Sequence, residues 1–127
     1  MMEPARKSIL GSLLALSVVV ACVAFGSFLP VRGKRALHTE GRLHVSLHMT
    51  IFALVAFVAF RAARSRTTRI AAFAGAVLLG FLIEEGEHLV YGAGMEWKDV
   101  LTDTVGVVAG TLLALVTASR RERPRQE

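Results

Sequence analysis

Four long apolar runs dominate the chain, separated by short polar or glycine-containing segments. The runs cover residues 8–29, 43–60, 70–90 and 98–118. Because an α-helix rises about 1.5 Å per residue, runs of this length can cross a hydrocarbon core about 30 Å thick. The pattern therefore predicts an all-α, polytopic membrane protein with four transmembrane helices, in a single domain that covers residues 1–127.

The segments between the runs carry the signals that end helices. Pro30 follows the first run and cannot continue a helix interior. The turn at 61–69 is rich in arginine, and Gly92 and Gly94 lie in the turn before the fourth run. We expect residues 119–127 to form a basic, disordered tail.

Cys22 leaves a second interpretation of the first run open. Val19-Val20-Ala21-Cys22 is a permissive lipobox after a basic start, so a lipoprotein signal is the alternative to a transmembrane helix. The chain stays apolar after Cys22, where a mature lipoprotein usually turns polar, and this favours the helix. A lone cysteine forms no internal disulfide, so cysteine usage does not indicate the redox compartment.

Composition supports a membrane protein over a soluble one. Apolar residues make up 54% of the chain and the mean hydropathy is +0.54, against about 45–50% apolar residues in soluble domains. The net charge is +5, but the basic residues flank the runs and form no patch interleaved with aromatic residues. No phosphate-binding glycine loop is present. We therefore expect the lipid bilayer as a partner, and no nucleic acid.

The basic residues also predict an orientation. With four spans, both termini share a side with the 61–69 turn, and that side holds ten of the 15 lysines and arginines. Cytoplasmic loops are enriched in these residues, so the bias predicts N-in/C-in. Tyr91 and Trp97 then lie at the outer interface, where aromatic residues are common.

Polar residues gather in the outer parts of three predicted helices. The candidates for a polar pocket are His48, Glu84, Glu85, His88, Asp99 and Asp103. An acid inside a membrane span costs about 2.5–3.5 kcal/mol on insertion scales, which makes it a functional-site candidate. Counted from the outer helix ends, His48, Glu84 and Asp103 share a depth of about 7–9 Å.

Helical spacing predicts which of these candidates face the inside of the bundle. Asp99, Asp103, Gly106 and Gly110 follow one face of the fourth run, and Gly106-x-x-x-Gly110 is a small-residue packing pattern. That face can approach a neighbouring helix closely, so we expect Asp103 to point into the bundle. Glu85 is the better placed acid of the third run by pattern.

Three other acids fit a solvated position in the headgroup region equally well. They are Glu84, Glu87 and Asp99. We expect His44 to be interfacial rather than a ligand.

These motifs resemble the VanZ-like family of small bacterial membrane proteins. The matching residues are Ser27-Phe28-Leu29-Pro30, then His48, Phe52 and Val55, then Glu85-Gly86-Glu87-His88, and finally Asp99, Asp103, Gly106 and Gly110. They cover about residues 25–110. The resemblance implies a multi-pass protein of the bacterial inner (cytoplasmic) membrane with a role in the cell envelope. Some members of the family are linked to glycopeptide (teicoplanin) resistance.

The sequence departs from the family pattern at several positions, among them an Asp-Lys pair that often precedes the histidine and is absent here. His88 stands where the family has glutamine, and Asp103 stands where it has asparagine. An arginine common in the turn before the first aspartate is missing, and Gly94 or Met95 occupies its place. These changes make the site more acidic and better suited to a metal.

Four functions remain open at this point. The first is an extracytoplasmic-side pocket for an envelope or lipid-linked ligand. The second is a divalent metal site suited to Zn or Mn, which could activate water for hydrolysis of a lipid headgroup, although no HExxH motif supports it. Its ligands would come from His48, Glu85, His88, Asp99 and Asp103.

The third function is a small proton-coupled exporter, although the first run lacks the acid that such exporters carry. The fourth is a purely structural polar network between helices. We expect no resident cofactor, and a binding or structural protein rather than an enzyme. Four helices barely enclose a pocket, so we also consider a homodimer.

Overall fold

The computed structural model describes residues 3–28, 32, 42–92 and 94–122. Within this part of the chain the ordered elements are four long helices, and none of these residues lies in a strand. The helices are α1 (Glu3–Ser27), α3 (Arg42–Ala62), α4 (Arg66–Tyr91) and α5 (Trp97–Glu122). The all-α fold predicted from the apolar runs is therefore confirmed.

Several helix ends differ from the sequence-based boundaries. Helix α1 begins at Glu3 and ends at Ser27 instead of covering 8–29, while Pro30 lies outside the described residues. Helix α5 continues to Glu122, so the expected tail at 119–127 is wrong for its first residues. Ordinary helix formers continue the backbone hydrogen bonding after an apolar face ends, so hydrophobicity alone marks these ends poorly.

Helix α4 begins four residues earlier than its apolar run because Ser65 caps it. The Ser65 hydroxyl accepts a hydrogen bond from the Thr68 backbone N–H at 3.1 Å, and the Thr68 hydroxyl accepts one from the Ser65 N–H at 3.0 Å. This reciprocal arrangement is a capping box, which satisfies N–H groups that have no partner inside the helix. At the other end Gly92 adopts φ 64°, a left-handed conformation that suits glycine and terminates the helix.

Three helices are long and apolar enough to cross a membrane, namely α3, α4 and α5. Their spans are Arg42–Ala62, Arg66–Tyr91 and Trp97–Arg120. In α1 the apolar stretch within the described residues is Leu16–Gly26, which is shorter than a span. The structure thus indicates a membrane-associated helix bundle, and the fourth span remains a prediction.

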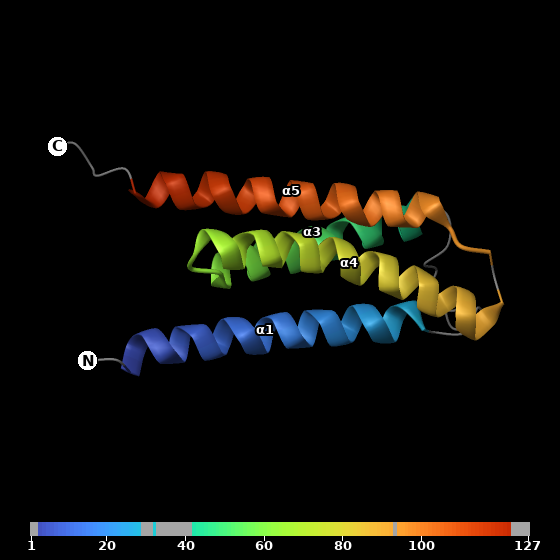
Figure 1. Cartoon of the computed structure of the whole chain (residues 1–127), viewed down its shortest axis with the longest axis horizontal. Coiled ribbons are helices and arrows are strands. Elements are labelled where there is room, and N and C mark those ends of the chain that lie inside the picture. The colour runs from blue at the N-terminus through green and yellow to red at the C-terminus, as the bar shows by residue number, and fades with distance from the viewer. Residues whose placement is uncertain (1–2, 29–31, 33–41, 93, 123–127) are drawn as a thin grey trace.

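The helices run up and down along one long axis (Figure 1). Helix α1 and helix α5 lie on opposite sides of the bundle, with α3 and α4 between them, and α3 contacts all three other helices. The most extensive contact joins α3 to α5, which run in the same direction. The first residues of α3 and α5 therefore lie at one end of the molecule, beside the last residues of α4.

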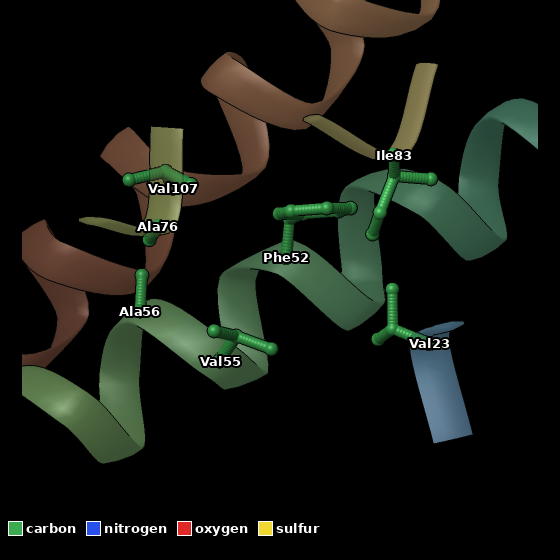
Figure 2. Close-up of a cluster of buried hydrophobic side chains, with 7 residues drawn as sticks. All are labelled: Val23, Phe52, Val55, Ala56, Ala76, Ile83 and Val107. Carbon is green, nitrogen blue, oxygen red and sulfur yellow. The ribbon is translucent and has the colours of Figure 1, made fainter. Parts of the chain in front are cut away.

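A small apolar core holds the four helices together, and every helix contributes to it (Figure 2). Phe52 of α3 and Val107 of α5 are fully buried, and Val23 of α1 and Ile83 of α4 lie at the same end of the cluster, to the right of Phe52 in Figure 2. Many large apolar side chains point outward instead, among them Leu78, Leu101 and Leu112. An apolar exterior over a modest core is what a bilayer-facing bundle requires, because lipid is as apolar as leucine.

Glycines let α5 lie directly against the backbone of α3. A side chain at Gly106 would meet the carbonyl oxygen of Met49, and one at Gly110 would meet the carbonyl oxygen of Ala53. Both contacts are to main-chain atoms, which cannot rotate away. The small-residue stripe of α5 is thus the surface on which α3 packs, and it sets the distance between their side chains.

Candidate functional site

Two histidine–aspartate pairs connect α3 to α5 near the helix starts. His44 Nε2 lies 3.3 Å from Asp99 Oδ2, and His48 Nδ1 lies 2.9 Å from Asp103 Oδ1. Both pairs join residues that are 55 positions apart, a constant offset that follows from the parallel packing of the two helices. The two histidines are four residues apart on α3, and the two aspartates are four residues apart on α5. Each set therefore lies on one face of its helix, with its two members one turn apart. We call His44 and Asp99 the end pair.

The deeper pair gains a third member from α4. One potential ligand atom each from His48, Glu84 and Asp103 lies within 4.8 Å of the others. We call these three residues the inner cluster. Glu84 is 4% exposed and Asp103 is 1% exposed, so both carboxylates of the cluster are buried within the bundle. The structure therefore brings together, at one depth, three residues from three separate helices.

Gly80 allows α4 to bring Glu84 to the cluster. A side chain at Gly80 would lie 3.1 Å from both Cβ and Oδ2 of Asp103 and 3.4 Å from the Phe52 ring. Glycine leaves room for Asp103 to sit against α4, and Glu84 is one turn further along the same face. The position of the carboxylates thus depends on a residue that has no side chain.

Not every polar atom of the cluster has a hydrogen-bond partner. Glu84 Oε1 and Asp103 Oδ2 are buried and accept no hydrogen bond from the described residues. Leaving a buried acceptor unpaired costs about 1–3 kcal/mol. Native proteins pair nearly all such atoms, so an unpaired one needs an explanation.

The ring of His48 is held between two other rings. Its centroid lies 4.3 Å from that of His44 and 6.5 Å from that of Phe52, the latter in a stacked arrangement. These three residues follow one another at four-residue intervals along α3. The imidazole of His48 is consequently fixed in orientation by packing as well as by Asp103.

The end pair is close to the surface of the bundle. The side chain of His44 is 27% exposed, while Asp99 is largely buried. Beside it, an open hollow is lined by Met95, Glu96, Trp97 and Lys98. The first turn of α5 and the residues before it therefore form a mouth next to the end pair, with a carboxylate, an ammonium group and an indole ring on its wall.

Glu96 is the acid of this mouth that lies outside the membrane-spanning segments. A side-chain hydrogen bond with Asp99, the negative charge of Asp99 and partial burial together raise the pKa of Glu96 above its ordinary value. The backbone N–H of Asp99 also donates to the Glu96 carbonyl at 2.9 Å. The carboxyl groups of Glu96 and Asp99 therefore lie side by side at the start of α5.

The structure separates the two neighbouring acids of α4. The sequence pattern favours Glu85 as the inward acid and allows a headgroup position for Glu84, whereas it is Glu84 that is buried in the inner cluster. Glu85 is only half-buried, and His88 is exposed in the last turn of α4. Neither belongs to the inner cluster. Asp99 is also buried, contrary to a solvated headgroup position.

Sequence reasoning missed three contributors to the site. His44 pairs with Asp99, Gly80 leaves room for the carboxylates, and Glu96 makes a side-chain hydrogen bond with Asp99. The spacing of His44 and His48 matches that of Asp99 and Asp103, and this equal spacing is the signal that could have predicted two parallel pairs. No comparable pattern marks Gly80.

Comparisons of the chain with models of protein families, with curated proteins and with solved structures find no match.

Proposed function

We propose that this chain is a VanZ-like protein of the bacterial cytoplasmic membrane, which binds an envelope ligand at the mouth next to the end pair. In the predicted N-in/C-in orientation this mouth opens on the extracytoplasmic side, where lipid-linked envelope molecules are exposed. The motifs quoted above support the family, and the apolar helices support the location. The ligand site itself is argued from geometry.

One observation carries the proposal: a buried carboxylate at the start of α5 directly follows the residues that line an open hollow. Asp99 is largely buried, is paired with the partly exposed His44, and lies beside the hollow at Glu96 and Lys98. Polar groups in such a hydrophobic surrounding are expensive to bury, so they are typical of binding sites within membrane proteins. A headgroup entering the hollow would meet these groups first.

The groups around the mouth indicate the chemistry of the ligand. Glu96 and Asp99 favour an ammonium group, while the Lys98 ammonium favours a phosphate oxygen. Trp97 is 64% exposed, and its ring contacts Phe81 at a centroid distance of 6.3 Å, which offers an apolar surface for the first carbons of a lipid chain. The combination suits a lipid whose headgroup carries both an amine and a phosphate.

Lipid retention tests this proposal directly. The full chain is reconstituted in nanodiscs that contain equal parts of phosphatidylethanolamine and phosphatidylglycerol, and the lipids that stay bound after transfer to detergent are counted by native mass spectrometry. We expect wild type to retain phosphatidylethanolamine preferentially. The double variant Glu96→Gln with Asp99→Asn should lose this preference about tenfold, which corresponds to about 1.4 kcal/mol, because the amine then has no carboxylate partner at the mouth.

Glu85→Gln provides the control, since it removes one carboxylate from the same end of the bundle without touching the mouth. Equal retention of the two lipids by wild type would contradict the proposal. An equal loss in the control and the double variant would do so as well, because it would reflect overall charge.

The histidine–aspartate pairs also support a second candidate function, a structural one. Both pairs join the same two helices, as interhelical hydrogen bonds in membrane proteins do. In that case His44→Phe would lower the melting temperature in detergent and leave lipid retention unchanged. If the pair instead belongs to a ligand site, lipid retention should change in His44→Phe, whether or not the melting temperature changes.

A further inference from the structure

We propose that His48, Glu84 and Asp103 bind a divalent metal ion, Zn²⁺ or Mn²⁺, inside the bundle. Their ligand atoms lie within 4.8 Å of one another and come from α3, α4 and α5. The site uses none of the residues of the mouth. It therefore goes beyond the proposed ligand binding and does not depend on it.

The unpartnered oxygens of the inner cluster point to a cation. Glu84 Oε1 and Asp103 Oδ2 are both buried without a hydrogen-bond partner among the described residues. Asp103 Oδ2 faces α4, because it lies 3.1 Å from the position that a Cβ of Gly80 would take, and Gly80 is one turn from Glu84. A positive ion between the two carboxylates would give both oxygens a partner, which no donor among the described residues does.

Charge balance supports the same assignment. Two carboxylates buried side by side in a low-dielectric interior repel each other and lose their hydration. A divalent ion supplies the two positive charges that offset them, whereas a single histidine supplies at most one. The arrangement is therefore better matched to a bound ion than to the His48–Asp103 pair alone.

The donor set selects the kind of ion. One imidazole with two carboxylates suits Zn²⁺ or Mn²⁺, while Mg²⁺ prefers oxygen ligands and keeps several waters. Ligand atoms that share a tetrahedral zinc ion at about 2.0–2.1 Å lie about 3.3–3.4 Å apart. The ligand atoms of the cluster lie within 4.8 Å of one another, so the side chains must close by up to about 1.5 Å around the ion.

The surroundings hold the histidine ready for this role. The ring of His48 is flanked by His44 and stacks on Phe52, and its side chain is only 12% exposed. Three protein ligands leave a fourth position of a tetrahedral ion open, as in zinc sites that bind a further small ligand. The deep position of the cluster would limit that ligand to a small molecule or water.

Metal binding to the purified full-length protein tests the inference. The protein is treated with a chelator in detergent, desalted, incubated with Zn²⁺, Mn²⁺ or Mg²⁺ alone, desalted again and analysed for metal per chain. We expect about one Zn²⁺ or Mn²⁺ per chain and no stoichiometric Mg²⁺. Glu84→Gln and Asp103→Asn should each weaken Zn²⁺ binding at least tenfold in a calorimetric titration, because each loses a charged ligand.

A spectroscopic readout separates lost ligands from lost folding. Co²⁺ bound in place of Zn²⁺ should give the intense visible absorption of a four-coordinate ion in wild type, and Glu84→Gln should lose it while keeping wild-type helicity by circular dichroism. Glu85→Gln, one residue away on α4, is the matched control and should bind Zn²⁺ as wild type does.

Two results would overturn the inference. One is a wild-type protein that is helical and monodisperse and yet holds less than a tenth of an equivalent of either ion. The other is unchanged Zn²⁺ affinity in Glu84→Gln and Asp103→Asn, which would place the ion elsewhere on the chain. Neither result bears on lipid retention at the mouth, so the two proposals fail separately.

Discussion

Asp103 shows how much of this protein depends on single residues. It is almost fully buried, it bonds to His48 from α3, and its second oxygen faces Gly80 of α4. A charged side chain in this position is destabilising by itself, and it is tolerated because neighbours on two other helices are shaped around it. The residues of the inner cluster are thus related by contact, although they lie far apart in the sequence.

At the same scale, the Glu96–Asp99 pair makes stability depend on pH. In the folded protein the hydrogen bond to Asp99 and its negative charge raise the pKa of Glu96, so the folded state holds this proton more tightly than the unfolded state. The ionisation of Glu96 therefore has no effect on the free energy of unfolding at low pH, where the group is neutral in both states. It lowers the free energy of unfolding as the pH rises above the ordinary pKa range of a glutamate. Of the other groups that act on Glu96, His44 opposes the rise and Glu87 adds to it.

We predict that Glu96→Gln raises the melting temperature in detergent at pH 7.5 by about 1–2 °C, because it removes the repulsion between Glu96 and Asp99. The rise is small because Glu96 is exposed and solvent screens this repulsion. The difference from wild type should shrink toward pH 4, where both proteins carry a neutral group at this position. Melting curves at half-unit pH steps measure it. A difference in melting temperature that grows toward pH 4 would contradict this prediction, because it would show that the folded protein stabilises the charged form of Glu96.

At the scale of elements, the parallel pair α3 and α5 organises the bundle. These helices are not neighbours in the sequence, yet they share the most extensive contact and both histidine–aspartate pairs. Gly106 and Gly110 bring the two backbones together, and the pairs follow from that closeness. The face of α5 that carries small residues is therefore also the face that carries the acids.

This closeness predicts a large effect of a small substitution. Gly110→Ala places a methyl group against the Ala53 carbonyl, which is part of a helix and cannot move aside. We expect a loss of about 1–3 kcal/mol of stability from overpacking, measured by denaturant titration in detergent micelles. Gly75→Ala is the matched control, because a methyl group there meets nothing within 4 Å and alanine favours the helix by up to about 1 kcal/mol. Equal stability of the two variants would mean that α3 and α5 are further apart than described.

At the scale of the whole molecule, the ends of the helices divide the protein into two chemically different ends (Figure 1). Helix α1 begins and α5 ends at the end that also holds the arginine-rich connection between α3 and α4, where Arg69 lies 5.3 Å from the centre of the Phe60 ring. The opposite end holds the mouth, the aromatic residues Tyr91 and Trp97, and a hydrogen bond from the Tyr91 hydroxyl to the Phe28 carbonyl. This division matches the distribution of basic residues from which N-in/C-in is predicted.

Cysteine labelling in intact cells tests this orientation. In a Cys22→Ala background, which removes the only cysteine, we expect Gly94→Cys to react with a membrane-impermeant maleimide from outside. Arg64→Cys should react only after the cells are permeabilised, because positively charged turns stay in the cytoplasm.

A tag at the amino terminus should be protected in the same way as Arg64→Cys if α1 crosses the membrane. A tag accessible from outside would leave three spans instead of four. Reversed labelling of the two cysteines would place the mouth in the cytoplasm and would remove the envelope ligand proposed for it.

The sequence by itself determined the all-α fold, the long apolar character of α3, α4 and α5 and the small-residue face of α5, while the fourth span that it predicts remains a prediction. These follow from local composition and from the 3.6-residue period, which each segment displays without reference to the others. Equal helix depths even placed His48, Glu84 and Asp103 at one level of the membrane. Local capping moved the start of α4, but it did not alter the number of described long helices.

Only the tertiary structure decided which face of each helix meets which neighbour. Adjacent residues of a helix differ by about 100° in direction, so Glu84 and Glu85 cannot both face the bundle. The rotation of α4 about its axis decides that Glu84 faces inward, and this rotation is set by packing against the neighbouring helices. That packing depends on Gly80, which lies against Asp103 of α5, while Gly106 and Gly110 set the distance between α5 and α3; all three contacts depend on atoms distant in the sequence. The site exists because three helices pack closely, and close packing is a property of the assembled bundle.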